Sequence, residues 1–394
     1  MVPPTTQRVT DPASRLAADL RGVGRLAIDG VTGVTDIVEA LHAAIGHLPS
    51  VIGRPAPATT TGPARIVYRS VRGVARLVGA GVDRSLSALA PVLGGRDLSP
   101  QREALVAAIN GVLGDHLERS GNPLAIPMQF RVAGTPLALD AVSKQLPRAG
   151  GKVLVLLHGL CMNDLQWRYA GHDHGEALAR ELDCTRVDLH YNTGRHIAAN
   201  GREFAASLEA LVHAWPVPVE QIVLLCHSMG GLVARSALDV AVREQRAWTT
   251  RPIRVVFLGT PHHGAPLERA GAWADQLIAI SPYSAPFVKL GRVRSAGITD
   301  LRHGTVADAP TPLPKHVRAY AIAATTQAPG RDDNAATLRG DGLVPIASAF
   351  GDHVDPGRDL RIPASRRWLA TGTHHLDLLG SDAVYQRIVH WLRR

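Results

Sequence analysis

Apolar and polar positions follow two different patterns along this chain. From residue 128 onward, short apolar runs of strand length alternate with longer stretches of helical spacing. The strand-like runs are Met128–Val132, Pro136–Leu139, Val153–Leu157, Arg186–Tyr191, Ile222–Cys226, Ile253–Leu258 and Val317–Ala323. The helical stretches between and after them include Glu203–Trp215, Met229–Arg246 and Ser381–Leu392. This alternation predicts an α/β fold with a doubly wound, mostly parallel sheet over residues 125–394.

The first 124 residues have helical spacing and little strand signal. Ser14–Ala43 predicts one or two helices, Pro49–Pro63 a linker rich in Pro, Thr and Gly, and Pro100–Glu118 a further helix. We therefore expect residues 1–124 to form a helical N-terminal segment. Between Pro266 and Pro314 the strand–helix alternation lapses and apolar side chains gather, which predicts a cap or lid at about 266–314. A helical excursion without a gating role is the alternative.

Four arginines and four valines in the N-terminal segment recur at helical spacing on opposite faces. The arginines are Arg65, Arg69, Arg72 and Arg76, and the valines are Val67, Val71, Val74 and Val78. This pattern predicts a basic amphipathic helix. A surface helix packed on the main domain is the favoured interpretation, and peripheral contact with a membrane surface is the alternative.

Composition narrows the functional class. The 394 residues are 45% hydrophobic with a net charge of +9, and lysine contributes only four of the 43 basic residues. No nucleic-acid-binding motif accompanies this charge, so we expect no nucleic-acid partner. The N-terminus has no apolar signal-peptide core, no apolar run is long enough for a membrane span, and the three cysteines are scattered. These features predict a cytoplasmic protein without a metal site.

A serine lies at the tip of a turn between a predicted strand and a predicted helix. The run Ile222–Gly231 ends in Cys226-His227-Ser228-Met229-Gly230-Gly231, with Cys226 at the place where the G-x-S-x-G pattern has its first glycine. Small residues allow strand and helix to approach closely at such a nucleophile elbow, which exposes the serine hydroxyl. The Met229 amide would then lie at a helix N-terminus, where it can stabilise an oxyanion.

Other candidate groups follow strands, as expected at the carboxyl edge of a parallel sheet. His158-Gly159-Leu160 follows one strand and offers the Leu160 amide as a second oxyanion donor. Asp341 lies between two glycines, downstream of the serine, and is favoured over Asp332 and Asp333 as the acid. His375 is the first choice as base and His374 the second, in the chain order Ser, Asp, His. Three further histidines are assigned to loops around the pocket: His158, His227 and His262.

Together these motifs resemble the α/β-hydrolase superfamily over roughly Met128–Arg394. Within it the chain is most similar to bacterial lipases and esterases and to hydrolases related to GPI-inositol deacylase. The resemblance implies a Ser228–His375–Asp341 triad and an oxyanion hole formed by Leu160 and Met229, with no cofactor required. It implies a small-molecule or lipid ester as substrate. Acyl transfer or thioester cleavage by the same triad remains an alternative, and a non-catalytic, membrane-docking scaffold is a third.

Overall fold

The computed structural model describes residues 100–264, 295–307, 311–328 and 340–394, together with residues 18–22, 24–26, 28–29, 65, 69–70 and 72–73. The chain divides into two compact units, Met1–Ser99 with Arg119–Leu124, and Pro100–Glu118 with Ala125–Arg394. All described residues between 18 and 73 are helical, as the sequence predicts. The predicted linker, most of the predicted cap, and Asp332 and Asp333 lie outside the described residues.

The second unit has the α/β architecture with a doubly wound, mostly parallel sheet that the sequence predicts, built on eight strands in the order β10-β9-β8-β7-β3-β6-β1-β2. The strands from β10 to β6 are parallel, whereas β1 and β2 form an antiparallel hairpin at the edge. Their bounds are β1 Gln129–Val132, β2 Thr135–Pro136, β3 Lys152–Leu157, β6 Thr185–His190, β7 Gln221–His227, β8 Ile253–Leu258, β9 Val317–Ala324 and β10 Arg367–Ala370. A separate two-stranded ribbon joins β4 Arg168–Tyr169 to β5 His172–Asp173.

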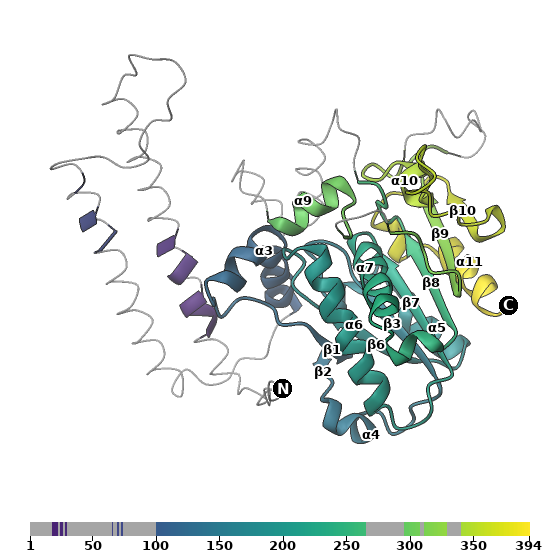
Figure 1. The fold of residues 1–394 in the computed structure, drawn as a ribbon, viewed down its shortest axis with the longest axis horizontal. Helices are drawn as coiled ribbons and strands as arrows, with labels where there is room; N and C mark the ends of the chain where they lie inside the picture. The colour runs from purple at the N-terminus through teal and green to yellow at the C-terminus, as the bar shows by residue number, and fades with distance from the viewer. Residues whose placement is uncertain are drawn as a thin grey trace, which may run out of the picture. The chain divides into compact units, whose positions relative to one another are not determined.

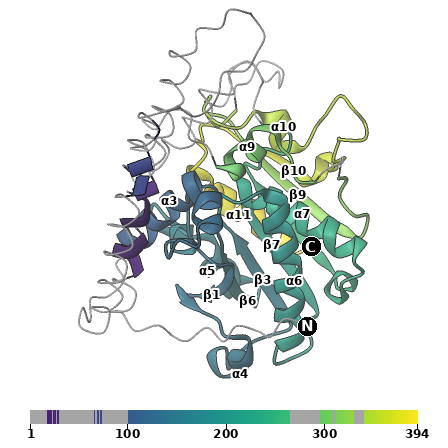
Figure 2. The same ribbon diagram turned by 60° about the vertical axis from the view of Figure 1, so that its left-hand side comes forward.

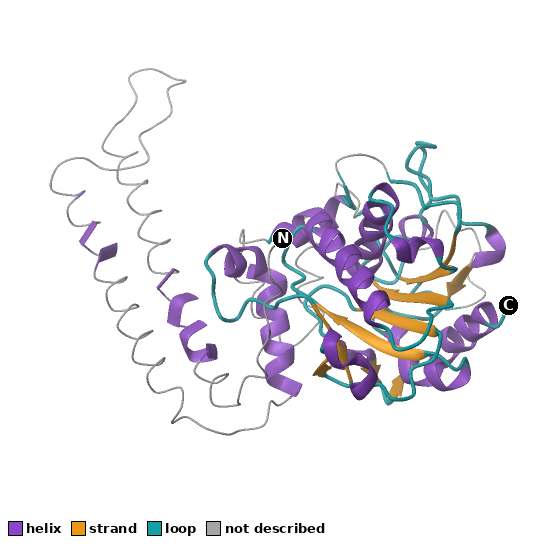
Figure 3. Cartoon of the chain, turned by 60° about the horizontal axis from the view of Figure 1, so that its bottom comes forward, coloured by secondary structure: helices purple, strands orange, loops and turns teal. Residues whose placement is uncertain are grey.

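Helices cover both faces of this sheet (Figures 1 and 3). Their bounds are α3 Pro100–Arg119, α4 Val142–Gln145, α5 His174–Glu181, α6 Ile197–Ala214, α7 Met229–Arg243, α9 Ala296–His303, α10 Ile346–Phe350 and α11 Asp382–Leu392. Alternate strand residues enter two core clusters, one with side chains of α3, α6 and α7 and the other with side chains of α5 and α11. These helices are labelled in Figure 2. Strand side chains point alternately to the two faces, so both faces of the central strands are buried.

The winding of the sheet places two loops next to each other. The chain runs from β3 to β6 on one side and then crosses to β7 on the other side of β3. This is a topological switch point, and ligands bind at the carboxyl ends of the strands there. The loop after β3 carries Leu160, and the turn after β7 carries Ser228. The topology thus brings the predicted oxyanion loop beside the predicted nucleophile.

Three elements differ from the sequence expectation. Helix α6 begins at Ile197 rather than at Glu203. Gly201 lies within it as a contact point for α7, since a Cβ there would lie 2.2 Å from Ser236 Oγ. Helix α7 ends at Arg243, since Gln245 has a left-handed φ of 53°. Pro100–Glu118 belongs to the sheet-containing unit and not to an N-terminal segment, because its Ala107, Ala108 and Val112 are fully buried.

In the described part of the chain, no helix combines the length and the apolar composition that a membrane span requires.

Candidate active site

Ser228 occupies the sharp turn between β7 and α7. Its backbone has φ 52° and ψ −121°, in the region of positive φ that residues other than glycine rarely adopt. Such a conformation costs about 1–3 kcal/mol and persists only where its surroundings impose it. The Ser228 amide donates to Leu258 O at 2.9 Å, and the Ser228 carbonyl accepts from the Gly231 amide at 3.1 Å. The end of the neighbouring strand β8 and the first turn of α7 therefore hold the strained serine in place.

Small residues after Ser228 allow the elbow to close. A Cβ on Gly230 would lie 2.3 Å from Leu157 O and 2.8 Å from His158 O, both of them backbone atoms. Before the serine, Cys226 stands where a glycine is usual. Its side chain is fully buried in the core cluster that contains α6 and α7. The thiol therefore fits the strand–helix packing, and burial raises its pKa well above the ordinary value, which keeps it protonated.

Asp341 binds His375 through one carboxylate oxygen and the backbone through the other. The distance from His375 Nδ1 to Asp341 Oδ2 is 2.6 Å, and Oδ1 accepts from the amides of Leu343 and Val344 at 2.9 and 2.8 Å. The His375 amide also donates to Asp341 O at 3.2 Å. Both side chains are almost completely buried. The carboxylate accepts a hydrogen bond from Nδ1, so the ring proton lies on Nδ1 and the lone pair lies on Nε2.

His375 lies against the elbow, with its Nε2 available. This nitrogen is buried and has no hydrogen-bond partner among the described residues. His227, which precedes the serine, has its ring 4.8 Å from that of His375 and places Nε2 3.2 Å from His375 O. His374 is exposed, and its amide donates to Asp377 Oδ2 at 3.0 Å. The structure brings His375 and not His374 to Asp341.

The loop after β3 approaches the elbow closely. A Cβ on Gly159 would lie 3.2 Å from Ser228 Cβ. The amides that follow Leu160 are engaged elsewhere, since Cys161 N donates to Thr193 Oγ1 at 3.2 Å and Met162 N to Gly159 O at 3.3 Å. Leu160 and Met229, the predicted oxyanion donors, thus belong to two backbone segments that meet beside Ser228.

The three histidines assigned to the pocket are buried and neutral. Burial lowers the pKa of His158 to about 3, and its ring stacks on Tyr191 at 4.5 Å. Burial, followed by the neighbouring His375, lowers the pKa of His227 well below its usual value. Burial and then Arg235 do the same for the pKa of His262, which packs edge-on against Phe257. Among the described residues, no three His, Cys, Asp or Glu side chains are grouped to hold a metal ion.

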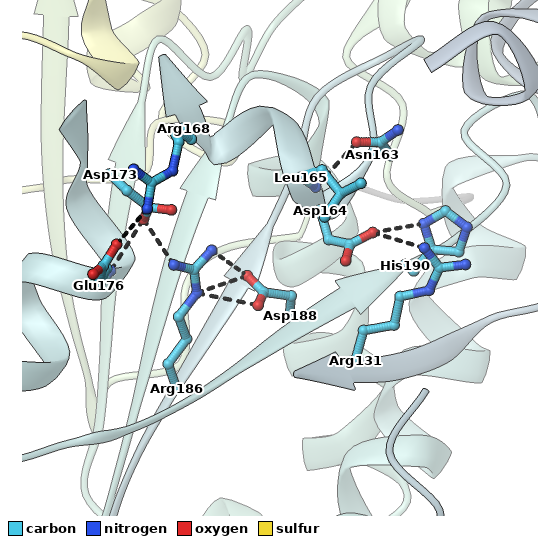
Figure 4. Close-up of polar contacts among 10 residues, drawn as sticks. All are labelled: Arg131, Asn163, Asp164, Leu165, Arg168, Asp173, Glu176, Arg186, Asp188 and His190. Carbon is cyan, nitrogen blue, oxygen red and sulfur yellow. Dashed lines mark hydrogen bonds and ion pairs between the residues drawn. The ribbon is translucent and has the colours of Figure 1, made fainter. Parts of the chain in front are cut away.

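A buried polar network around Asp164 was not predicted from the sequence. It joins Arg131 on β1, Asp164 at the start of a 3-10 helix after β3, and His190 at the end of β6. Arg186 separately pairs with Asp188 and Asp173 (Figure 4). The available signal was the presence of charged residues inside apolar strands, such as Arg131 in the run Gln129–Val132. Such residues are buried at low cost only when they are paired.

Comparison with known families gives one match. A domain of unknown function, DUF7379, matches residues 127–299, which is less than half of the chain and includes Leu160, Ser228 and Met229 but neither Asp341 nor His375. No curated protein matches the chain.

Several solved structures resemble the chain weakly. The mature lipase BlEst2 of Bacillus licheniformis is 18% identical, covers 60% of this chain and 91% of its own, and has a TM-score of 0.42. An esterase from Thermogutta terrifontis is 14% identical, with coverages of 68% and 93% and a TM-score of 0.36. The NocB thioesterase domain is 16% identical, with coverages of 63% and 96% and a TM-score of 0.36. Likenesses at this level assign no activity.

Proposed function

We propose that this protein is a serine hydrolase that cleaves carboxylic esters through an acyl-enzyme. The observation that carries the proposal is the pairing of His375 Nδ1 with Asp341 Oδ2 at 2.6 Å beside a serine held at a φ of 52°. A nucleophile at a strained elbow, a base with a free Nε2 and a buried orienting acid are the parts that this chemistry needs.

The reaction has two halves. His375 Nε2 accepts the proton of Ser228 Oγ as Oγ bonds to the ester carbonyl carbon, and the amides of Leu160 and Met229 stabilise the oxyanion. The carbon–oxygen bond to the alcohol then breaks, and His375 returns the proton to the departing alcohol. Water repeats the sequence on the acyl-enzyme and releases the carboxylic acid and free Ser228. Each oxyanion donor of this kind contributes about 3–4 kcal/mol.

We further propose, from the sequence motifs around Ser228, Asp341 and His375, that the enzyme is similar to bacterial lipases and esterases and to hydrolases related to GPI-inositol deacylase.

The test is hydrolysis of p-nitrophenyl esters of increasing acyl length by the full chain, beside Ser228→Ala. We expect turnover by the wild type and a loss of about 10⁶-fold in the variant, with its circular dichroism spectrum unchanged. Equal rates in the two proteins would contradict the proposal. Adding a competing alcohol and an acyl thioester to the same assay distinguishes hydrolysis from acyl transfer and thioester cleavage.

A further inference from the structure

Helix α3 touches the loop that carries the proposed oxyanion donor. We call residues 158–164 the oxyanion loop. A Cβ on Gly111 of α3 would lie 2.2 Å from Cys161 Sγ and 3.0 Å from both Cys161 N and Cα. Cys161 is buried and has a left-handed φ of 59°, so its backbone is strained where it meets the helix. The lack of a side chain at Gly111 therefore lets this strained backbone pack against the helix.

Two ion pairs connect α3 to Asp164, at the far end of the oxyanion loop from Gly159. Arg131 Nη1 lies 3.0 Å from Glu103 Oε2 on α3 and 3.1 Å from Asp164 Oδ1 in the loop. His190 Nδ1 lies 3.2 Å from the same Asp164 oxygen (Figure 4). Burial alone would raise the pKa of Asp164, but His190 and Arg131 outweigh it and lower that pKa to about 2. Asp164 therefore remains charged, and one guanidinium links helix and loop.

The loop after β6 ties the two segments together once more. Asn192 Nδ2 donates to Gly114 O of α3 at 2.9 Å, and Thr193 Oγ1 accepts from the amide of Cys161 at 3.2 Å. Ser295 Oγ donates to Gly111 O at 2.7 Å from the start of α9. The loop after β6 therefore binds both the middle of α3 and Cys161 in the oxyanion loop. Ser295 adds a further hydrogen bond to the middle of α3.

We propose that α3 positions the Leu160 amide, with Glu103, Gly111, Arg131 and Asp164 acting as positioning residues for the oxyanion hole. This rests on the proposed function. Leu160 directly precedes Cys161, so a displacement of Cys161 by α3 moves the amide that binds the oxyanion. Since hydrogen bonds weaken steeply with distance and angle, a small shift lowers transition-state binding while substrate binding is preserved.

The experiment compares Gly111→Ala with Gly111→Ala/Cys161→Gly in the full chain. Gly111→Ala is expected to lower kcat by about tenfold or more and to leave KM little changed. This loss is smaller than the roughly 10²–10³-fold loss of kcat that follows complete removal of an oxyanion donor. Affinity for a boronic acid, which forms a tetrahedral adduct with the serine, falls by the same factor. The second substitution removes the Sγ that the new methyl group meets, and fits the positive φ, so it restores most of kcat.

Charge substitutions provide an independent arm if Gly111→Ala does not fold. Glu103→Gln is expected to lower kcat several-fold with KM unchanged, whereas Glu118→Gln, which breaks the ion pair of the same helix with Arg195, leaves kcat unchanged. Unchanged kcat in folded Gly111→Ala and Glu103→Gln, or a loss that Cys161→Gly does not relieve, overturns the proposal. An inactive wild type that no fluorophosphonate labels overturns the proposed function as well, which separates the two failures.

Discussion

His375 and Asp341 are joined twice, through their side chains and through their backbones. Besides the 2.6 Å contact between Nδ1 and Oδ2, the His375 amide donates to the Asp341 carbonyl at 3.2 Å. The loop after β9 and the loop after β10 are therefore held next to each other at the carboxyl edge of the sheet. The orientation of the imidazole is fixed before any substrate binds, which is the preorganisation that general-base catalysis uses.

Asp341→Asn is expected to lower kcat by about 10³–10⁴-fold, because an amide in place of the carboxylate favours the wrong imidazole tautomer. The substituted side chain keeps one oxygen that can accept from the amides of Leu343 and Val344, so folding is preserved. Steady-state ester hydrolysis measures the effect. Asp377→Asn, at a half-buried carboxylate two residues past His375, is the matched control and leaves kcat unchanged. A comparable loss in both variants would contradict the assignment of Asp341.

The two adjacent histidines are expected to respond differently. His375→Ala removes the buried imidazole that Asp341 orients, and should lower kcat by about 10⁴-fold or more. His374→Ala removes an exposed side chain and should leave kcat unchanged. The measurement is turnover of one ester by both variants at matched folded concentration. Greater loss in His374→Ala would reverse the assignment of the base.

Gly230→Ala is expected to damage the elbow itself. The added methyl group meets two backbone carbonyls, which cannot move aside as a side chain can. We predict a loss of about 3 kcal/mol or more in the free energy of unfolding, measured with urea. Gly171→Ala is the control: no atom lies near its Cβ, so only its φ of 82° opposes alanine, at about 1 kcal/mol. Equal losses would show that the elbow is not closely packed.

Acid should destabilise the fold through its buried imidazoles. Burial lowers the pKa of His158 to about 3 and that of His174 to about 4, against about 6.5 in the unfolded chain. The stability that the neutral rings contribute is complete above pH 6.5 and is lost as pH falls from there towards the folded-state values. Each ring then costs about 1–2 kcal/mol at pH 5.

Urea midpoints between pH 8 and pH 5 test this prediction. In His174→Asn the urea midpoint should fall less between pH 8 and pH 5 than in the wild type, by the contribution of one imidazole. In His390→Asn, at an exposed position of α11, the midpoint should depend on pH as it does in the wild type. An identical slope in wild type and His174→Asn would contradict the account.

Local patterns predicted the framework of the site. The strands before Leu160 and Ser228 are buried on both faces, so they read as unbroken apolar runs, and the turn of small residues after the second run marks the elbow. The predicted serine, acid and base lie after strands, and the parallel sheet brings loops from distant parts of the sequence to one edge. The α/β class with its mostly parallel sheet therefore followed from the spacing of apolar residues.

Contacts between distant segments were not predictable in the same way. The Gly111–Cys161 contact joins positions about fifty residues apart, and Arg131 reaches Asp164 across 33 residues. One signal was present: Ala104, Ala107, Ala108, Gly111 and Gly114 give α3 a face of small residues, which allows another backbone to approach closely. Spacing identifies such a face, but not the segment that packs on it. Short elements such as α5 and β10 were missed because few residues define them.

Labelling with a fluorophosphonate probe, followed by mass spectrometry of the modified peptide, tests the central claim most directly. We predict one adduct, on the peptide that contains Ser228, formed in the wild type and absent from Ser228→Ala, with Asp341→Asn labelled more slowly than the wild type. An unlabelled wild type whose fold is intact, or an adduct on any other residue, would contradict the assignment of Ser228 as the nucleophile.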